Sequence, residues 1–205
     1  MRKISSLFPN VKAIEARVVI LCPVQSVYHF YRDFRNLPRF LGDVISIEQT
    51  GPDTSQWTIQ GPLGIKTHWT IKVTEARTNQ SLHYETVSSL SLRTYWEIYF
   101  SSGPNPGQTE VRQVMRVPLG RLGRAALAMI GKSPVKEVSA NLHRLKQVME
   151  TGTVTDTSYS VPGKFSNQRR DRIAPDNTLR QADCNVDPEI AKLRKALAEG
   201  WVFRN

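Results

Sequence analysis

One amphipathic stretch near residue 140 restricts most strongly how this chain can fold. Apolar residues recur there three and four positions apart, at Val135, Val138, Leu142, Leu145 and Met149. This spacing predicts a helix of about seventeen residues with one apolar face, about 25 Å long and able to cross a whole sheet. Such a helix laid across a sheet can enclose a hollow that suits an apolar molecule.

Residues that begin and end helices flank this stretch. Ser133 can act as N-cap, Pro134 fits the first helical position, and Gly152 can adopt the backbone conformation that ends a helix. The helix is therefore predicted to begin at 134 and to end at 151.

Short segments of strand character precede this helix. Residues 13–22 are rich in Val and Ile, Pro23 begins a helix through about residue 33, and a short helical turn follows at 36–41. Turn residues then separate six further strands, at 44–50, 55–61, 65–77, 80–88, 91–101 and 108–117. The connections are too short for crossover helices, so we expect an antiparallel meander.

Composition narrows the class of protein. Of the 205 residues, 40% are hydrophobic and 22% charged, which suits one domain with a well-buried core plus a tail. The net charge of +10 favours an anionic partner. Cys22 and Cys184 lie far apart in unlike surroundings, which argues against a disulfide or a cysteine metal site and for a reducing, cytoplasmic compartment. We expect no signal peptide and no membrane-spanning segment.

Several motifs resemble a known superfamily. They are RDFRNLPRF at 32–40, Trp57, GPLG at 61–64, Trp69, and LHRLKQVMETG at 142–152. On these residues the chain resembles the SRPBCC (START-like) superfamily, in its polyketide cyclase/dehydrase-like branch, over residues 11–152. The resemblance implies an α+β helix-grip fold, in which a curved antiparallel sheet of about seven strands wraps around a long C-terminal helix and two short helices follow the first strand. It also implies a deep cavity for lipids, sterols, polyketides or quinones, in a group where many members have no demonstrated reaction.

Strand alternation separates two faces of the expected sheet. Its apolar face and the helix stripe supply the candidate ligand-binding residues: Trp57, Ile59, Thr67, Trp69, Ile71, Leu82, Tyr84, Thr86, Thr94, Trp96, Ile98, Gln113, Met115, Val138, Leu142, Leu145 and Met149. The solvent-facing positions are Lys66, His68, Lys72, His83, Glu85, Arg93, Glu97, Arg112 and Arg116. A filled core is the default for the apolar set, but three tryptophans interspersed with Thr, Tyr and Gln favour a pocket of roughly 300–1,000 Å³.

Recognisable catalytic and metal motifs are missing from the sequence. His29, His68, His83 and His143 have no paired ligand spacing, so no metal, cofactor or catalytic residue is predicted. Glu97 and Arg39 could serve as an acid and an anion clamp, but ordinary surface charge explains them more simply. Residues 126–133 fit a permissive Walker A pattern, yet their Leu-Ala-Met-Ile run lacks the glycine-rich loop that holds phosphate, which excludes nucleotide binding on that motif.

Basic residues gather between 112 and 146, where eight Lys and Arg stand against one Glu. Within this window an apolar segment at 119–131 precedes the long helix. Arg121, Arg124, Lys132 and Lys136 could contact an anionic membrane while the cavity exchanges lipid. The alternative is a lid packed on its own core with solvated arginines.

Residues 153–205 form a polar tail, and from 153 to 187 its texture has no period, which predicts an extended or disordered segment. Inside it, residues 188–199 can form a short amphipathic helix, either docked on its own domain or used as a motif for a partner.

Three functional hypotheses follow. The first is a non-catalytic carrier or sensor of a hydrophobic small molecule of lipid, isoprenoid/quinone or polyketide type, with peripheral membrane contact in some states. The second is a cyclase or dehydratase of polyketide-like substrates. The third is a basic interaction module for RNA, the ribosome or an anionic membrane, although nucleic acid has no support beyond charge. The sequence does not specify the oligomeric state.

Overall fold

The computed structural model describes residues 13–61, 64–87, 94–116, 134–165 and 184. Its elements, in chain order, are β1 (Ala13–Ile20), α1 (Val24–Arg32), η2 (Phe34–Arg39), β2 (Val44–Gln49), β3 (Thr54–Gln60), β4 (Lys66–Arg77), β5 (Ser81–Val87), β6 (Tyr95–Ser102), β7 (Thr109–Arg116) and α3 (Pro134–Thr151). These bounds lie close to the predicted ones, because alternation and turn residues mark each strand locally.

Seven strands form one antiparallel sheet in the order β1-β7-β6-β5-β4-β3-β2. From β2 to β7 each strand pairs with the next along the chain, as the short connections predicted. The first strand, β1, forms one edge of the sheet and pairs with β7, from Ala13 opposite Arg116 to Ile20 opposite Thr109. The α+β helix-grip architecture is thereby confirmed.

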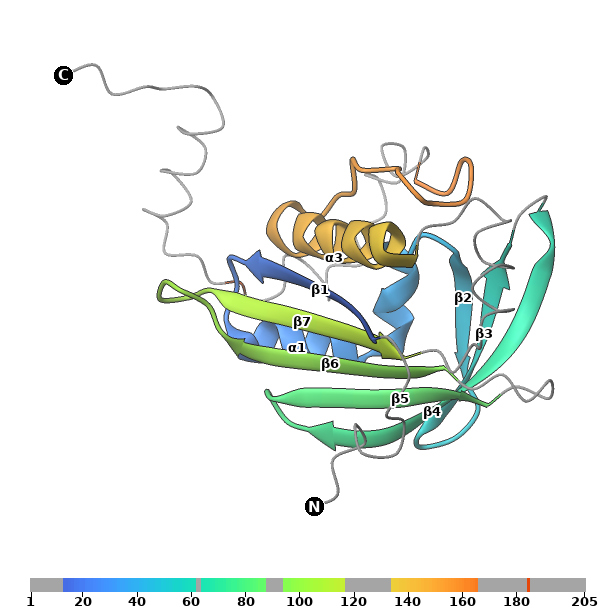
Figure 1. Ribbon diagram of the computed structural model, residues 1–205, viewed down its shortest axis with the longest axis horizontal. Helices are drawn as coiled ribbons and strands as arrows, with labels where there is room; N and C mark the ends of the chain where they lie inside the picture. Colours follow the sequence, from blue (N-terminus) through green and yellow to red (C-terminus); the bar gives the residue numbers. More distant parts are fainter. Residues whose placement is uncertain (1–12, 62–63, 88–93, 117–133, 166–183, 185–205) are drawn as a thin grey trace.

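Two short helical elements connect β1 to β2. The first, α1, ends at Arg32, and Asp33 then accepts a hydrogen bond from the backbone N–H of Arg35 and caps η2. The predicted helical turn at 36–41 therefore begins two residues earlier, at Phe34. Contacts place α1 against β6 and η2 against β2 (Figure 1).

The long helix α3 runs beside β1 (Figure 1). Val138, Leu142, Leu145 and Met149 are buried as the stripe predicted. Val135 is the exception, because 53% of it is exposed. Ala140, Asn141, Arg144 and Val148 are buried beside the stripe, so α3 hides a broader face than its apolar residues indicated.

The first part of the tail packs on the domain. Residues 153–165 contain no helix or strand, but Val154 and Phe165 are buried. The backbone N–H of Val161 donates to Gly42 O at 2.9 Å. A Cβ at Gly42 would lie 2.8 Å from Tyr159 O, so this close approach needs glycine. Residues 153–165 therefore lack helix and strand but pack on the domain. The short helix predicted at 188–199 lies outside the described residues.

The expectation of unpaired cysteines is wrong. Cys22, in the loop between β1 and α1, forms a disulfide with Cys184 of the tail. The two cysteines are 162 positions apart in the sequence, and no local pattern indicates their pairing, because only the folded chain brings them together. The inference of a reducing compartment rested on unpaired thiols, and the disulfide removes that basis. Among the described helices, none has the length and hydropathy to span a bilayer.

Candidate functional site

Strand register brings the predicted aromatic residues onto one face of the sheet. Trp57 of β3 lies opposite Trp69 of β4, and Tyr84 of β5 lies opposite Trp96 of β6. We call these four residues the aromatic wall. The neighbouring predicted positions pair on the same face: Ile59 with Thr67, Ile71 with Thr86, Leu82 with Ile98, Ile98 with Gln113, and Trp96 with Met115.

Rings of the wall contact one another and one residue outside the sheet. Tyr84 stacks on Trp96 with centroids 6.0 Å apart, and the Tyr84 and Trp57 centroids lie 5.9 Å apart. Phe34, the first residue of η2, meets Trp57 and Tyr84 edge-on at 5.5 and 5.6 Å. Offset and edge-to-face pairs of this kind stabilise the cluster beyond area burial. Phe34 is not among the residues predicted to bind a ligand, although it lies in the motif at 32–40 that suggested the superfamily.

Burial divides the candidate residues into two groups. The buried group packs in the core: Trp57, Ile71, Leu82, Tyr84, Thr86, Thr94, Ile98, Gln113, Met115, Val138, Leu142, Leu145 and Met149. Ile59, Trp69 and Trp96 are half-buried and Thr67 is exposed. The half-buried indoles mark the part of the wall that the protein covers least, which is where an apolar molecule would gain most by contact.

Two polar atoms are buried here without a partner among the described residues: Tyr31 Oη and Gln113 Oε1. The hydroxyls of Tyr31 and Tyr84 interact, although Tyr31 Oη lacks the geometry of a hydrogen bond. Burial raises the pKa of both tyrosines, so both hydroxyls stay neutral at physiological pH. An unsatisfied donor and an unsatisfied acceptor beside an apolar wall suit a ligand with an oxygen function or an ordered water.

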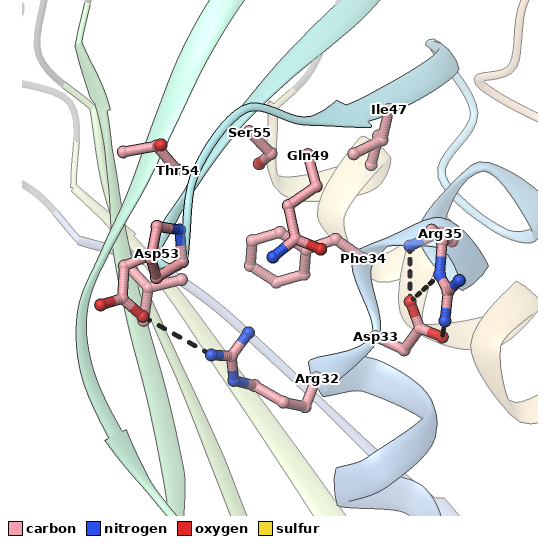
Figure 2. Close-up of a pocket in the computed structure, with 11 residues that line it drawn as sticks. Arg32, Asp33, Phe34, Arg35, Ile47, Gln49, Asp53, Thr54 and Ser55 are labelled. Atoms are coloured by element: carbon pink, nitrogen blue, oxygen red, sulfur yellow. Dashed lines mark hydrogen bonds and ion pairs between the residues drawn. The ribbon is translucent and has the colours of Figure 1, made fainter.

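A pocket of about 100 Å³ opens where α1 meets η2. It is lined by Arg32, Asp33, Phe34, Arg35, Ile47, Gln49, Pro52, Asp53, Thr54, Ser55 and Val73. Figure 2 shows the Phe34 ring at its centre, with Arg32 and Asp53 to one side and Asp33 with Arg35 to the other. The pocket therefore combines an aromatic floor with a charged rim.

The two arginines of this rim are held differently. Arg35 donates to Asp33 from Nε and from Nη2, both at 2.8 Å, and these hydrogen bonds lower the pKa of Asp33. The closest approach of Arg32 to Asp53 is 3.7 Å, between side chains 36% and 61% exposed. A well-formed charged hydrogen bond measures about 2.7–2.9 Å, so the Arg32–Asp53 pair is the looser one.

Residues 12–150 match the family described as polyketide cyclase/dehydrase and lipid transport. The chain belongs to this family. Its fold is also that of a Deinococcus radiodurans protein, which is 22% identical with a TM-score of 0.54 over 69% of this chain and 99% of that one. No curated protein sequence matches the chain.

Two further structures share the family fold. A START superfamily protein from Mycobacterium smegmatis is 11% identical, with a TM-score of 0.52 over 66% of this chain and 98% of that one. The di-domain aromatase/cyclase BexL of the BE-7585A biosynthetic pathway is 15% identical, with a TM-score of 0.52 over 68% of this chain and 48% of that one. At these identities the likeness establishes the fold alone.

The basic window of this family member is less exposed than its sequence suggested. Arg144 is fully buried, Arg116 pairs with Glu97 at 3.0 Å, and Lys146 pairs with Glu150 at 2.7 Å. Lys136 is exposed and lines a shallow groove of about 360 Å³ between α3 and the tail. Arg121, Arg124 and Lys132 lie outside the described residues, so membrane contact through these four side chains stays a prediction.

The outer face of the sheet also departs from expectation. His83 and Glu97 were predicted to face solvent, but both are buried. Burial works to raise the pKa of Glu97, and hydrogen bonds from Arg116 and Tyr99 outweigh it, so the pKa is lowered. Glu97 is therefore a charged structural partner rather than an acid. Over the described residues, no cluster of His, Cys, Asp or Glu could hold a metal ion.

Proposed function

We propose that this protein binds a hydrophobic small molecule, of lipid, isoprenoid/quinone or polyketide type, between the sheet and α3, as a carrier or sensor. The half-exposed edge of the aromatic wall is the observation that carries the proposal. Trp69 and Trp96 present apolar surface on the same face as buried Trp57 and Tyr84. A ligand that covers these rings gains about 25 cal/mol for each Å² of apolar surface removed from water.

Membership of the family adds a second, independent support. The family description names lipid transport beside cyclase and dehydrase activity, and both imply a hydrophobic small molecule. The buried Tyr31 Oη and Gln113 Oε1 supply the few polar contacts that orient a ligand in a mostly apolar site.

A cyclase or dehydratase is the second candidate. The observation in its favour is the neutral Tyr31 hydroxyl, which makes no well-formed hydrogen bond among the described residues and could donate one to a substrate carbonyl as negative charge develops on it. Incubation with a poly-β-ketone thioester and mass analysis of the product separates the candidates. Loss of water or ring closure at a rate that falls in Tyr31→Phe would establish the enzyme.

The first test of the carrier proposal is native mass spectrometry of the purified full chain, with organic extraction of whatever co-purifies. We expect a stoichiometric apolar compound. Titration of the emptied protein with that compound, or with 1-anilinonaphthalene-8-sulfonate if none is found, then gives an affinity.

Matched variants locate the binding surface. Trp96→Ala removes a half-buried ring of the wall and should weaken binding about tenfold. Tyr159→Ala, which truncates an exposed aromatic residue in the tail, should leave the affinity within about twofold. Equal affinities for both variants and the unaltered protein would show that the wall does not bind the ligand.

A further inference from the structure

The pocket at the start of η2 opens on the same side of the sheet as the aromatic wall. Ser55 lines it two residues before Trp57 on β3, and Val73 lines it four residues after Trp69 on β4. Residues two or four apart on a strand share one face. The pocket and the wall are therefore neighbouring parts of one surface.

Phe34 lies at the boundary between them. Its ring lines the pocket and also contacts Trp57 and Tyr84. Phe34 is only half-buried, so part of it stays accessible to a ligand. A molecule spanning pocket and wall would lie along this ring.

The size of the pocket limits what it can hold. Its volume of about 100 Å³ is smaller than the roughly 150 Å³ of an enclosed apolar cavity that binds benzene. A ring system does not fit this space, whereas a carboxylate does. The pocket therefore suits the polar end of a ligand whose apolar part lies on the wall.

The charges of the pocket indicate the sign of that polar end. Arg35 is already hydrogen bonded to Asp33 through two side-chain atoms. Arg32 reaches Asp53 only at 3.7 Å, and Figure 2 shows its guanidinium turned toward this carboxylate at the pocket rim. A guanidinium binds a carboxylate best through two parallel hydrogen bonds. Because Arg32 does not form such a pair with Asp53, a better placed anion could replace Asp53 as its partner.

We propose that this pocket is a head-group subsite in which Arg32 binds the carboxylate of an amphipathic ligand, with Phe34 between the carboxylate and the aromatic wall. The inference rests on the proposed function and adds the ligand class: an apolar chain or ring system ending in a carboxylate. Asp53 is the internal competitor that occupies Arg32 when no ligand is bound.

The test compares two probes of equal chain length, dodecanoate and 1-dodecanol, bound to the full chain at pH 7.5 and followed by tryptophan fluorescence and calorimetry. Arg32→Gln should weaken dodecanoate about fivefold or more and change 1-dodecanol by less than about twofold. Asp53→Asn removes the competitor and should tighten dodecanoate alone. Arg17→Gln, an exposed arginine on β1, controls for the change in net charge and should alter neither affinity.

The outcomes separate this inference from the proposed function. If both probes bind and Arg32→Gln affects them equally or not at all, the head-group subsite is refuted while hydrophobic binding stands. If Asp53→Asn weakens dodecanoate, Asp53 is not a competitor and the inference fails. If the unaltered protein binds neither probe, the proposed function fails and the inference fails with it.

Discussion

The aromatic wall differs instructively from a second region, which we call the junction. At the junction, Arg144 of α3 meets the loop Phe40–Val44 and tail residues 154–165. Arg144 Nε donates to Phe40 O at 2.7 Å, Nη1 donates to Ser158 O at 2.6 Å, and Nη2 donates to Asn141 Oδ1. Its guanidinium also lies 5.3 Å from the centroid of the Phe165 ring.

Both regions bury polar atoms, and they differ in how completely these atoms are hydrogen bonded. Lys164 donates to Leu41 O and Val44 O there, and Asn141 Oδ1 also accepts from the backbone N–H of Gly42. In the wall, Trp57 Nε1 donates to Ser55 Oγ at 2.8 Å, but beside it Tyr31 Oη and Gln113 Oε1 lack well-formed hydrogen bonds among the described residues. A fully hydrogen-bonded buried network stabilises one arrangement of its side chains. Unsatisfied buried groups instead raise the free energy of the empty protein, and a ligand that hydrogen bonds to them would lower it.

Removing Arg144 should produce the largest loss of stability. Arg144→Met removes the guanidinium that donates to the carbonyls of Phe40 and Ser158, and it leaves Asn141 Oδ1 with the N–H of Gly42 alone among the described donors. We therefore expect a decrease of about 3–5 kcal/mol in the free energy of unfolding. Urea unfolding measures it, with Lys136→Met, an exposed residue on the same helix, as a control expected to change less than about 0.5 kcal/mol. Equal stabilities for the two variants would contradict the structural role of the junction.

Loss of the disulfide should have the next largest effect. Cys184→Ser frees the tail from the β1–α1 loop and should lower the free energy of unfolding by about 2–4 kcal/mol under non-reducing conditions. Alkylation of the unfolded, unreduced protein should add no label to the unaltered chain. Two labels per molecule would show that the thiols are unpaired.

The junction should also respond to pH. Burial lowers the pKa of Lys164 to about 8, below its ordinary value of 10.5, so the unfolded chain binds more protons between these two values. Stability therefore rises with pH across this window, and we expect a gain of about 1–2 kcal/mol between pH 7.5 and 9.5. Urea unfolding of Lys164→Met in parallel isolates this contribution, because other titrating groups cancel in the difference. If the difference in unfolding free energy between the unaltered protein and Lys164→Met did not change with pH, the contribution of Lys164 would be refuted.

The smallest expected change is at Tyr31, whose hydroxyl interacts with that of Tyr84 in the wall, and its sign is opposite. Tyr31→Phe removes a buried hydroxyl that makes no well-formed hydrogen bond among the described residues, so stability should stay unchanged or rise by up to about 1 kcal/mol. The same variant should bind an oxygen-bearing ligand less well. A loss of more than 1 kcal/mol in thermal or urea unfolding would mean that the hydroxyl is satisfied and would remove the contrast between the two regions.

The sequence predicted the wall better than the junction, for a physical reason. Trp57, Trp69 and Trp96 alternate with polar residues, and alternation alone puts them on one face of a sheet. Arg144 stands in a run of basic residues, and most acceptors of its hydrogen bonds are backbone carbonyls. Because every residue has a carbonyl, no side-chain pattern marks which ones will receive a guanidinium.

Local periodicity and turn chemistry determined the strands, α3 and the two faces of the sheet, because each depends on residues a few positions apart. The tertiary structure decided the pairing of β1 with β7, the place of Phe34 beside the wall, the burial of Arg144 and the disulfide of Cys22 with Cys184. Each of these joins segments distant in the sequence, and its free energy comes from contacts that exist only after the chain has folded.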